Sequence, residues 1–390
     1  MTGRGFTFWF LAGAIAGLIG LALLIFASPG FPATEPWDGV GPFTGMWAGG
    51  PFAPVVAESG GGDDPAAQDM ENITFGDYAD GTTLEAIGFD TATSWTVSSA
   101  RASAEMAYSG SNLVPDPGFE SVEPNTNWAN NPAWNSNLDY VYSGTKSMSG
   151  TACYKSCVGC LLSLSNGWHQ ISGHVKVITL SKNVWDGMYV WSCAVAAHQA
   201  WGSFPSSSIV SGFGSFSTPF LARQSGTYAF DSDGYNSRVV DDVGVYELAE
   251  GRIYAVYDYG KTYSKYSAAI VSPGENNASG LCFRLNSEME GVYVYQQVGY
   301  IGATIQPKMR IVVKQIDGTW ALKSEAAFTY SSGAVLEARE NDVTKDVDVY
   351  YNDVKVVSSN ADILDTFTGT IHGICAMSDA AMISTFVLTD

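Results

Sequence analysis

Cysteine is the residue type whose spacing in this chain most directly suggests chemistry. Cys153, Cys157 and Cys160 lie within one short segment, and Cys193 follows further along the chain. Outside the cytosol such a cluster permits a local disulfide, and the simplest interpretation is a disulfide or a set of buried thiols in a loop. Zinc held by three of these cysteines with Cys193 or His169 is the alternative. An iron–sulfur cluster of the kind this spacing allows would need strands alternating with helices, a pattern that the chain lacks.

Other catalytic signatures are missing from the sequence. It contains no Gly-rich phosphate loop, no His-Glu-x-x-His pair and no haem-attachment motif. Its histidines lie in no nucleophile motif, and a surface or strand position is the simpler interpretation of each: His169, His174, His198 and His372. The sequence therefore predicts a protein that is not an enzyme.

Charge excludes some partners. The chain of 390 residues has 19 Lys and Arg against 39 Asp and Glu, a formal net charge of −20. Nucleic-acid binding needs basic patches that displace counterions, so no nucleic-acid partner is expected. The same charge argues against adsorption onto anionic lipid. A composition that is 46% hydrophobic and 13% aromatic is ample for buried cores.

An uncharged apolar run, residues 6–27, predicts a transmembrane helix. At about 1.5 Å per residue it spans roughly 33 Å, enough to cross a bilayer. Arg4 favours a cytoplasmic stub, residues 1–5, and a single-pass protein whose body is periplasmic or extracellular. A cleaved signal peptide is the alternative. Small residues near one face of the helix, Gly13, Gly17 and Gly20, suit packing against another helix, although glycine is also common in lone membrane helices.

Residues 28–70 read as a leash rich in Pro and Gly that then becomes a flexible linker. A free tether would be polar, but this one carries large apolar side chains, including Trp37, Phe43, Trp47 and Phe52. Such a segment is expected to lie on the membrane interface or on a neighbouring membrane or surface protein.

The rest of the chain predicts β-structure. Short alternating or aromatic-rich runs are broken by Gly, Pro, Asn and Asp, as at 175–178, 239–246 and 310–313. Residues 345–357 predict a hairpin that turns at Asn352-Asp353. No later stretch keeps a long helical period, so the predicted fold class is all-β.

Two family resemblances refine this prediction. The motif Asn112-Leu-Val-Pro-Asp-Pro-Gly-Phe-Glu120, with Trp128, 142–148 and the closing run 239–246, resembles carbohydrate-binding modules of the galactose-binding-like jelly-roll type, over residues 112–248. That resemblance implies a structural calcium ion, which maps here onto Glu120 and Asp241 or Asp242. It also implies sugar binding on exposed aromatic rings. Trp134 and Trp185 are the preferred pair, although most tryptophans of such a module belong to its core.

The second resemblance is to concanavalin A-like, laminin-G-type lectin sandwiches. It rests on 73–84 followed by Trp95, on the strand-like runs 279–284 and 347–356, and on the closing runs 371–374 and 384–388. The predicted organisation is a discontinuous sandwich, 71–111 plus 249–390, with the jelly roll 112–248 inserted in it. Two tandem domains after a disordered 71–111 are the alternative.

Hydrolases of the concanavalin A-like kind usually carry Glu-x-Asp-x-x-Glu, and that pattern is missing here. Glu340-Asn-Asp342 is followed by Lys345 where the second Glu should stand. The preferred prediction is a non-catalytic, membrane-anchored extracytoplasmic subunit that docks on a larger assembly, such as a membrane complex, a cell surface or a virion. A glycan-binding adhesin or phage structural protein is the first alternative, and a glycoside hydrolase is the second.

Overall fold

The computed structural model describes residues 69–390 of the protein, except for short segments at 91–94, 121–132, 136–137, 151–152, 182–184, 194–196, 206–207, 235, 272–277, 302–303, 360–361 and 379–381. Within this part of the chain, no helix is long and apolar enough to cross a membrane. The predicted stub, transmembrane helix and most of the leash lie outside the described residues. The predictions made there stay predictions, namely those for Gly13, Gly17, Gly20, Trp37, Phe43, Trp47 and Phe52.

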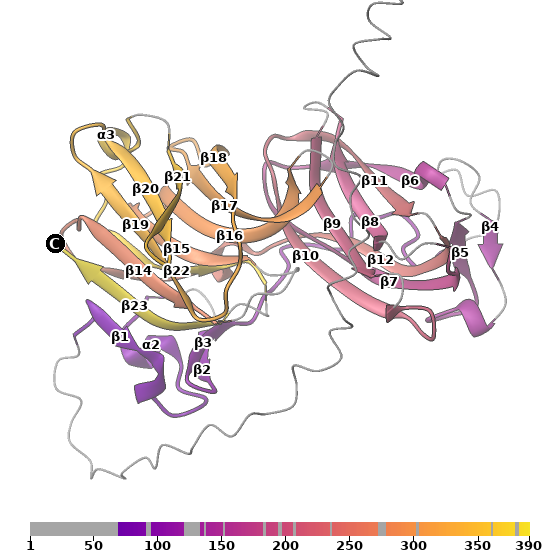
Figure 1. Ribbon diagram of the computed structural model, residues 1–390, viewed down its shortest axis with the longest axis horizontal. Helices are drawn as coiled ribbons and strands as arrows, with labels where there is room; N and C mark the ends of the chain where they lie inside the picture. The colour runs from indigo at the N-terminus through magenta and orange to yellow at the C-terminus, as the bar shows by residue number, and fades with distance from the viewer. Residues whose placement is uncertain are drawn as a thin grey trace, which may run out of the picture. The chain divides into compact units, whose positions relative to one another are not determined.

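Four antiparallel sheets make up the described residues, and they stack in pairs as two β-sandwiches (Figure 1). The 8-stranded sheet of the first sandwich contains β1 (Asn72–Thr74), β2 (Trp95–Ser98), β3 (Arg101–Ala104), β14 (Lys265–Ile270), β19 (Ala334–Asn341), β20 (Asp346–Tyr351), β21 (Val354–Ser358) and β23 (Ile383–Thr389). Its 6-stranded partner contains β13 (Tyr254–Asp258), β15 (Ala278–Leu285), β16 (Gly291–Ile301), β17 (Thr304–Lys314), β18 (Trp320–Ala327) and β22 (Ile371–Ala376).

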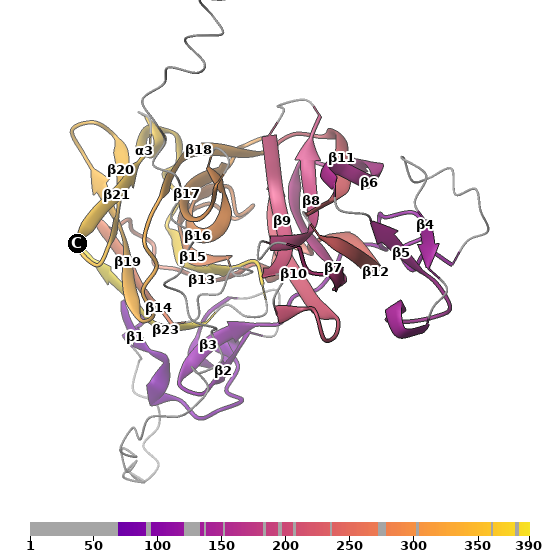
Figure 2. The ribbon, with the colours of Figure 1, turned by 45° about the vertical axis from the view of Figure 1, so that its right-hand side comes forward.

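The second sandwich is built from the strands that lie between β3 and β13 in the chain. Its 5-stranded sheet contains β4 (Ala133–Asn135), β5 (Ser147–Gly150), β7 (Gly167–Thr179), β10 (Gly214–Ala222) and β12 (Ser237–Glu247). Its 4-stranded sheet contains β6 (Cys153–Leu164), β8 (Trp185–Ser192), β9 (Ala197–Pro205) and β11 (Gly226–Gly234), and Figure 2 shows the two sheets from the side.

Helices are few and short in the described part of the chain: η1 (Phe75–Asp77), α2 (Leu84–Ile87), η2 (Leu138–Tyr140), η4 (Glu250–Arg252) and α3 (Ile363–Thr366). The prediction of an all-β fold built from sandwiches is confirmed. The residue limits predicted for the two domains stay a prediction.

Each sandwich has its own apolar core. In the first, Leu336 and Phe386 from the larger sheet pack with Val294 and Ile311 from the smaller one. In the second, Val175, Phe220 and Val245 meet Leu162 and Phe230. These side chains alternate with outward-facing residues along the strands, because successive residues of a strand point to opposite faces.

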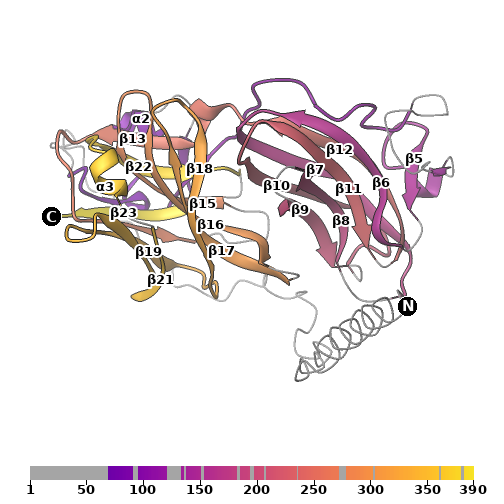
Figure 3. The same cartoon turned by 90° about the horizontal axis from the view of Figure 1, so that it is seen from above.

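A third apolar cluster joins the two sandwiches. Trp168, from the start of β7, packs edge to face on Tyr295 and Trp320 of the first sandwich, with ring centroids 5.1 and 5.9 Å away. Asn166 accepts a hydrogen bond from the Trp320 backbone N–H at 2.5 Å and donates to the carbonyls of Trp320 and Ala222. Figure 3, seen from above, shows β18 and β10 on the facing sides of the two sandwiches. Apolar packing and hydrogen bonds between side chain and backbone therefore both cross this junction.

The first and last described residues meet on the first sandwich. Glu71 O accepts from the Leu388 backbone N–H at 2.7 Å, and Glu71 Oε1 accepts from the Tyr263 hydroxyl at 2.6 Å. Lys261 bridges Glu71 and Asp390 at 3.2 and 3.3 Å. We call these contacts the terminal clasp.

Candidate functional site

Exposed aromatic rings gather on the outer face of the 5-stranded sheet. Along β7 the core residues alternate with outward-facing ones, so that His174 and Lys176 point away from the core. The Tyr142 ring stacks on His174 with centroids 3.4 Å apart, and Phe213 meets Tyr142 edge to face at 5.5 Å. Lys176 Nζ lies 5.2 Å from the Tyr140 ring centre and 5.9 Å from that of Phe213. We call Tyr140, Tyr142, His174, Lys176 and Phe213 the aromatic patch.

The patch offers both an apolar surface and polar groups. Tyr142 is 50% exposed, which is high for an aromatic ring that stacks on another. His174 is half-buried, and its Nδ1 atom has no hydrogen-bond partner among the described residues. Burial lowers the pKa of His174, partly opposed by the negative charge of Asp242, so the ring is neutral near pH 7. The neutral ring therefore contributes mainly its flat face, on which Tyr142 stacks.

Two buried or paired carboxylates hold the loop that carries Tyr142. Asp241 Oδ2 accepts hydrogen bonds from the backbone N–H groups of Tyr142 and Ser143, at 2.8 and 3.1 Å. Glu120 Oε1 accepts from the N–H groups of Thr145 and Lys146 at 2.7 and 2.9 Å. The loop is therefore fixed at both ends of its turn, which positions the Tyr142 ring over β7.

Gly144 is required at the tip of this loop. Its φ is +67°, and a Cβ at this position would overlap the Glu120 carboxylate. Only glycine adopts this conformation without strain and also lets Glu120 approach the backbone. The hydrogen bonds from Thr145, first through its side chain, lower the pKa of Glu120. Burial raises the pKa of Asp241, although the N–H groups of Ser143 and Tyr142 oppose that rise.

A second pair of tyrosines lies further along the same sheet face. Tyr108 stacks on Tyr246 of β12 with ring centroids 4.6 Å apart. The Tyr108 hydroxyl donates to Gln170 Oε1 on β7 at 3.2 Å, and Tyr108 is 43% exposed. The outer face therefore carries exposed rings at two places along the strands.

Two of the residues predicted to hold calcium, Asp241 and Glu120, bind the same loop, and their oxygens already have partners. Asp241 Oδ1 accepts from the Asp242 N–H at 2.9 Å, in addition to the two bonds to Oδ2, and Glu120 Oε2 accepts from the Thr145 hydroxyl at 2.6 Å. The described residues include no group of three or more His, Cys, Asp or Glu side chains placed to hold a metal ion. Amide hydrogens, which repel a cation, face the carboxylate oxygens of Asp241 and Glu120. Calcium stays an untested prediction from the sequence.

The predicted sugar-binding pair lies on different sheets. Trp134 is on β4 of the 5-stranded sheet and Trp185 is on β8 of the 4-stranded sheet. The side chains of both tryptophans lie outside the described residues, so their role stays a prediction.

The predicted cysteine cluster lies on strands of the 4-stranded sheet that are separated by β11. Cys160 is buried on β6, and Cys193 is an exposed, free thiol just after β8. The side chains of Cys153 and Cys157 lie outside the described residues. Their disulfide or metal chemistry therefore stays a prediction.

Carboxylates of the first sandwich are engaged by cations. Glu340 pairs with Arg284 and accepts from the Tyr266 hydroxyl at 2.9 Å. Glu337 pairs with Lys265 at 2.5 Å and also with Arg339. A general acid and base for hydrolysis need one carboxyl group kept protonated and one kept free, and neither of these two meets that need.

Comparisons with known proteins give only distant likenesses. No protein-family model matches the chain, and no curated protein matches its sequence. Among solved structures, the CBM22-1–CBM22-2 tandem domain of Paenibacillus barcinonensis Xyn10C is similar at 11% identity and a TM-score of 0.28, over 73% of this chain and 100% of that one. Domains LG4-5 of the mouse laminin α1 chain are similar at 8% identity and a TM-score of 0.20, over 65% of this chain and 91% of that one. Scores this low support no functional argument.

Proposed function

We propose that the protein is a non-catalytic carbohydrate-binding protein whose ligand lies on the aromatic patch. The stacked, half-exposed pair of Tyr142 and His174 carries this proposal, because a ring exposed in this way has apolar surface left to cover. Sugar rings present C–H groups that pack on aromatic faces, while their hydroxyls bond to nearby polar groups.

A polar group beside the rings suits sugar hydroxyls. Lys176 Nζ donates to Asp139 O at 2.8 Å and has further donors to spare. The rigid loop supports binding further, because Asp241 and Glu120 fix the Tyr142 backbone before any ligand arrives. Less ordering is then needed when the ligand binds.

Binding to a panel of immobilised glycans tests the proposal. The full chain in detergent should retain at least one polysaccharide, and Tyr142→Ala should weaken retention about tenfold, since losing a ring contact costs roughly 1.4 kcal/mol. Tyr257→Ala is the matched control, because Tyr257 is also an exposed tyrosine but lies on the first sandwich. Equal binding by both variants, or no retained glycan for the unmodified chain, would contradict the proposal.

We further propose that residues 6–27 anchor this body to a membrane and that the leash docks it on a larger assembly. Support comes from the sequence alone: an uncharged apolar run followed by an aromatic leash. Deleting 28–57 should release the body from co-purifying membrane proteins while leaving glycan retention unchanged. If the deletion leaves co-purification intact, docking through the leash is wrong, and the glycan proposal is unaffected.

A further inference from the structure

An excess of positive charge is buried at the junction between the sandwiches. Arg223 follows β10 of the second sandwich, and Lys308 and Arg310 lie on β17 of the first. All three lie near one carboxylate, that of Glu325 on β18. Its oxygens are 3.0 Å from Arg310 Nε, 3.1 Å from Lys308 Nζ and 3.6 Å from Arg223 Nη2. The Lys308 and Arg310 side chains are only 5% and 6% exposed, whereas those of Arg223 and Glu325 are 32% and 27% exposed, at the mouth of the cluster. The cluster therefore carries two positive charges more than negative ones.

This imbalance is costly in a chain whose net charge is −20. A buried charge without a partner is strongly destabilising, so excess buried cations point to an anion that completes the cluster. Burial and the neighbouring Arg310 charge lower the pKa of Lys308, and the same two causes lower that of Arg223. Glu325 alone does not remove this repulsion.

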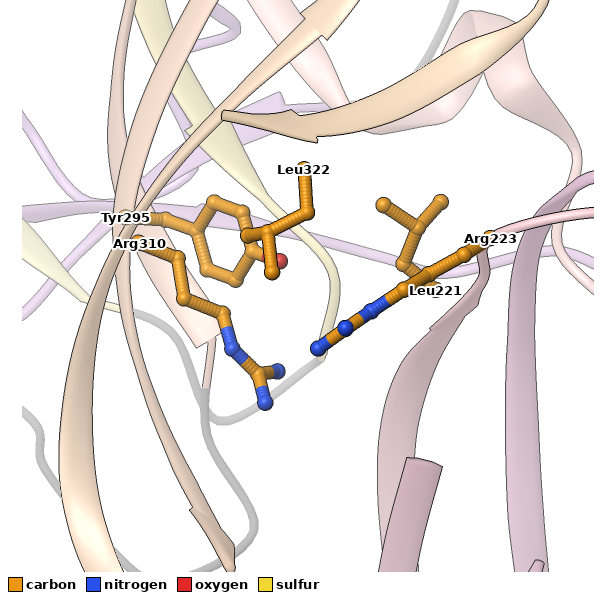
Figure 4. Close-up of a pocket in the computed structure, with 5 residues that line it drawn as sticks. All are labelled: Leu221, Arg223, Tyr295, Arg310 and Leu322. Atoms are coloured by element: carbon orange, nitrogen blue, oxygen red, sulfur yellow. The ribbon is translucent and has the colours of Figure 1, made fainter. Parts of the chain in front are cut away.

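A small cavity opens between the two guanidinium groups. Its volume is ≈ 10 Å³, and its walls are Leu221, Arg223, Tyr295, Arg310 and Leu322. Figure 4 shows the Arg223 and Arg310 guanidinium groups pointing into the same space, with the Tyr295 ring behind them. A cavity of that size holds about one water-sized atom, so a larger group could place one oxygen in it with the remainder at the mouth.

Tyr295 supplies an independent observation. The residue is fully buried and lines the cavity, and its hydroxyl hydrogen has no acceptor among the described residues. Arg310 lies beside this hydroxyl, so its charge and its hydrogen bond to the Tyr295 oxygen oppose the rise in the pKa of Tyr295, to about 12, that burial causes. A buried hydroxyl without an acceptor is rare, because leaving it unpaired costs about 1–3 kcal/mol.

The donors that remain all suit one class of ligand. Arg310 uses Nε on Glu325 and Nη1 on Gln297 Oε1, at 2.5 Å, so its other terminal nitrogen is left for the cavity. Arg223 reaches Glu325 only at 3.6 Å, beyond hydrogen-bond distance, so its planar fork is also available. We propose that the cavity at the junction binds a small oxyanion, a sulfate, phosphate or carboxylate group, through Arg223, Arg310 and the Tyr295 hydroxyl, and thereby fastens the two sandwiches together.

This inference does not depend on the proposed glycan function, because the patch and the cavity share no residue. Its ligand can be a free inorganic ion or the carboxylate of an acidic sugar, since both present the same oxygen acceptors. Thermal unfolding of the full chain in detergent, at matched ionic strength, distinguishes the two. Sodium sulfate and phosphate test the free ion, sodium glucuronate tests the acidic sugar, and sodium chloride is the reference.

The expected result is a rise in the unfolding midpoint that saturates at millimolar concentration of at least one oxyanion. Arg223→Gln should abolish this response, whereas Arg339→Gln should keep it, because Arg339 pairs with Glu337 on the other sheet of the first sandwich. Tyr295→Phe, which removes only the hydroxyl, should weaken oxyanion affinity about three- to tenfold, the worth of one hydrogen bond. Circular dichroism without oxyanion checks that each variant is folded.

Three results would overturn the proposal. One is an unmodified chain that unfolds at the same midpoint in chloride and in every oxyanion. Another is a folded Arg223→Gln variant that responds like Arg339→Gln. If Arg223→Gln does not fold, the test depends on Tyr295→Phe. An unchanged oxyanion affinity in that variant would show that the oxyanion does not bind in the cavity.

Discussion

Replacing His372 by glutamine should make the first sandwich less sensitive to acid. His372 lies on β22 and is fully buried among Tyr259, Tyr263 and Tyr266, with ring centroids 5.1–5.7 Å away. Its Nδ1 accepts from the Arg284 backbone N–H at 3.0 Å, so Nε2 carries the proton and donates to Lys261 O at 2.9 Å. Both ring nitrogens are used by the neutral form.

The sign and size of the effect follow from this environment. Burial lowers the pKa of His372 from 6.5 to about 4; the hydrogen bond to the Lys261 carbonyl opposes this shift, the Arg284 charge adds a smaller lowering, and Asp258 a still smaller rise. Between these two values the unfolded chain takes up a proton that the folded chain does not. Stability is therefore lost as the pH falls from about 6.5 to about 4, by at most roughly 3 kcal/mol at about 1.36 kcal/mol per pKa unit.

Glutamine keeps both hydrogen bonds but does not titrate. Its amide oxygen can accept from the Arg284 N–H, and its amide N–H can donate to Lys261 O. His372→Gln should be less stable than the unmodified chain at pH 7.5, because ring packing is lost. The difference should then shrink or reverse by roughly 3 kcal/mol towards pH 4.

Urea unfolding followed by tryptophan fluorescence, at half-unit pH steps from 7.5 to 4, measures this difference. His174→Gln is the control, because His174 is only half-buried and its pKa is also lowered; its profile should change less. Parallel profiles for His372→Gln and the unmodified chain would refute the reasoning, since they would mean that His372 does not resist protonation.

Three further predictions use the same unfolding assay or a thiol probe. Trp320→Ala should lower the free energy of unfolding by about 3–5 kcal/mol, because it empties the junction beside Trp168; an unchanged midpoint would mean that the junction adds no stability. Calcium and chelator should give equal midpoints, because the Glu120 oxygens are already hydrogen-bonded, and a rise of several degrees in calcium would restore the predicted metal site. Cys193 should react with a thiol reagent in the folded protein while buried Cys282 does not, and an unreactive Cys193 would favour the predicted disulfide.

Local patterns were enough to predict the strands. The alternation at 175–178 recurs in β7, where the buried residues belong to the core and the others face out. The hairpin predicted at Asn352-Asp353 forms between β20 and β21, with φ of 49° and 63° at its two turn residues. Positive φ at both positions is what a two-residue hairpin turn needs, and Asn and Asp tolerate it. Such signals are visible in sequence because they depend on neighbours in the chain.

The aromatic patch was missed because its parts are far apart in the chain. Tyr142 and His174 meet only because Asp241, from a third segment, fixes the Tyr142 loop over β7. The spacing of Tyr142, His174 and Asp241 in the sequence does not predict that contact. The alternation in β7 was enough to predict His174 and Lys176 on the outer face. The sugar site was instead predicted from two tryptophans, Trp134 and Trp185. The cluster of Arg223 with Glu325 could not be predicted for the same reason, because the two residues are far apart in the sequence.

The terminal clasp has a consequence for how the chain could be rearranged. Because Glu71 is bonded to Leu388, and Lys261 joins Glu71 to Asp390, a short peptide could connect residue 390 directly to residue 69. New ends could then be opened at the exposed turn Asn352-Asp353 without removing any strand from either sheet. The fold thus admits a circular permutant, in which the chain begins at a different strand of the first sandwich and both cores are unchanged.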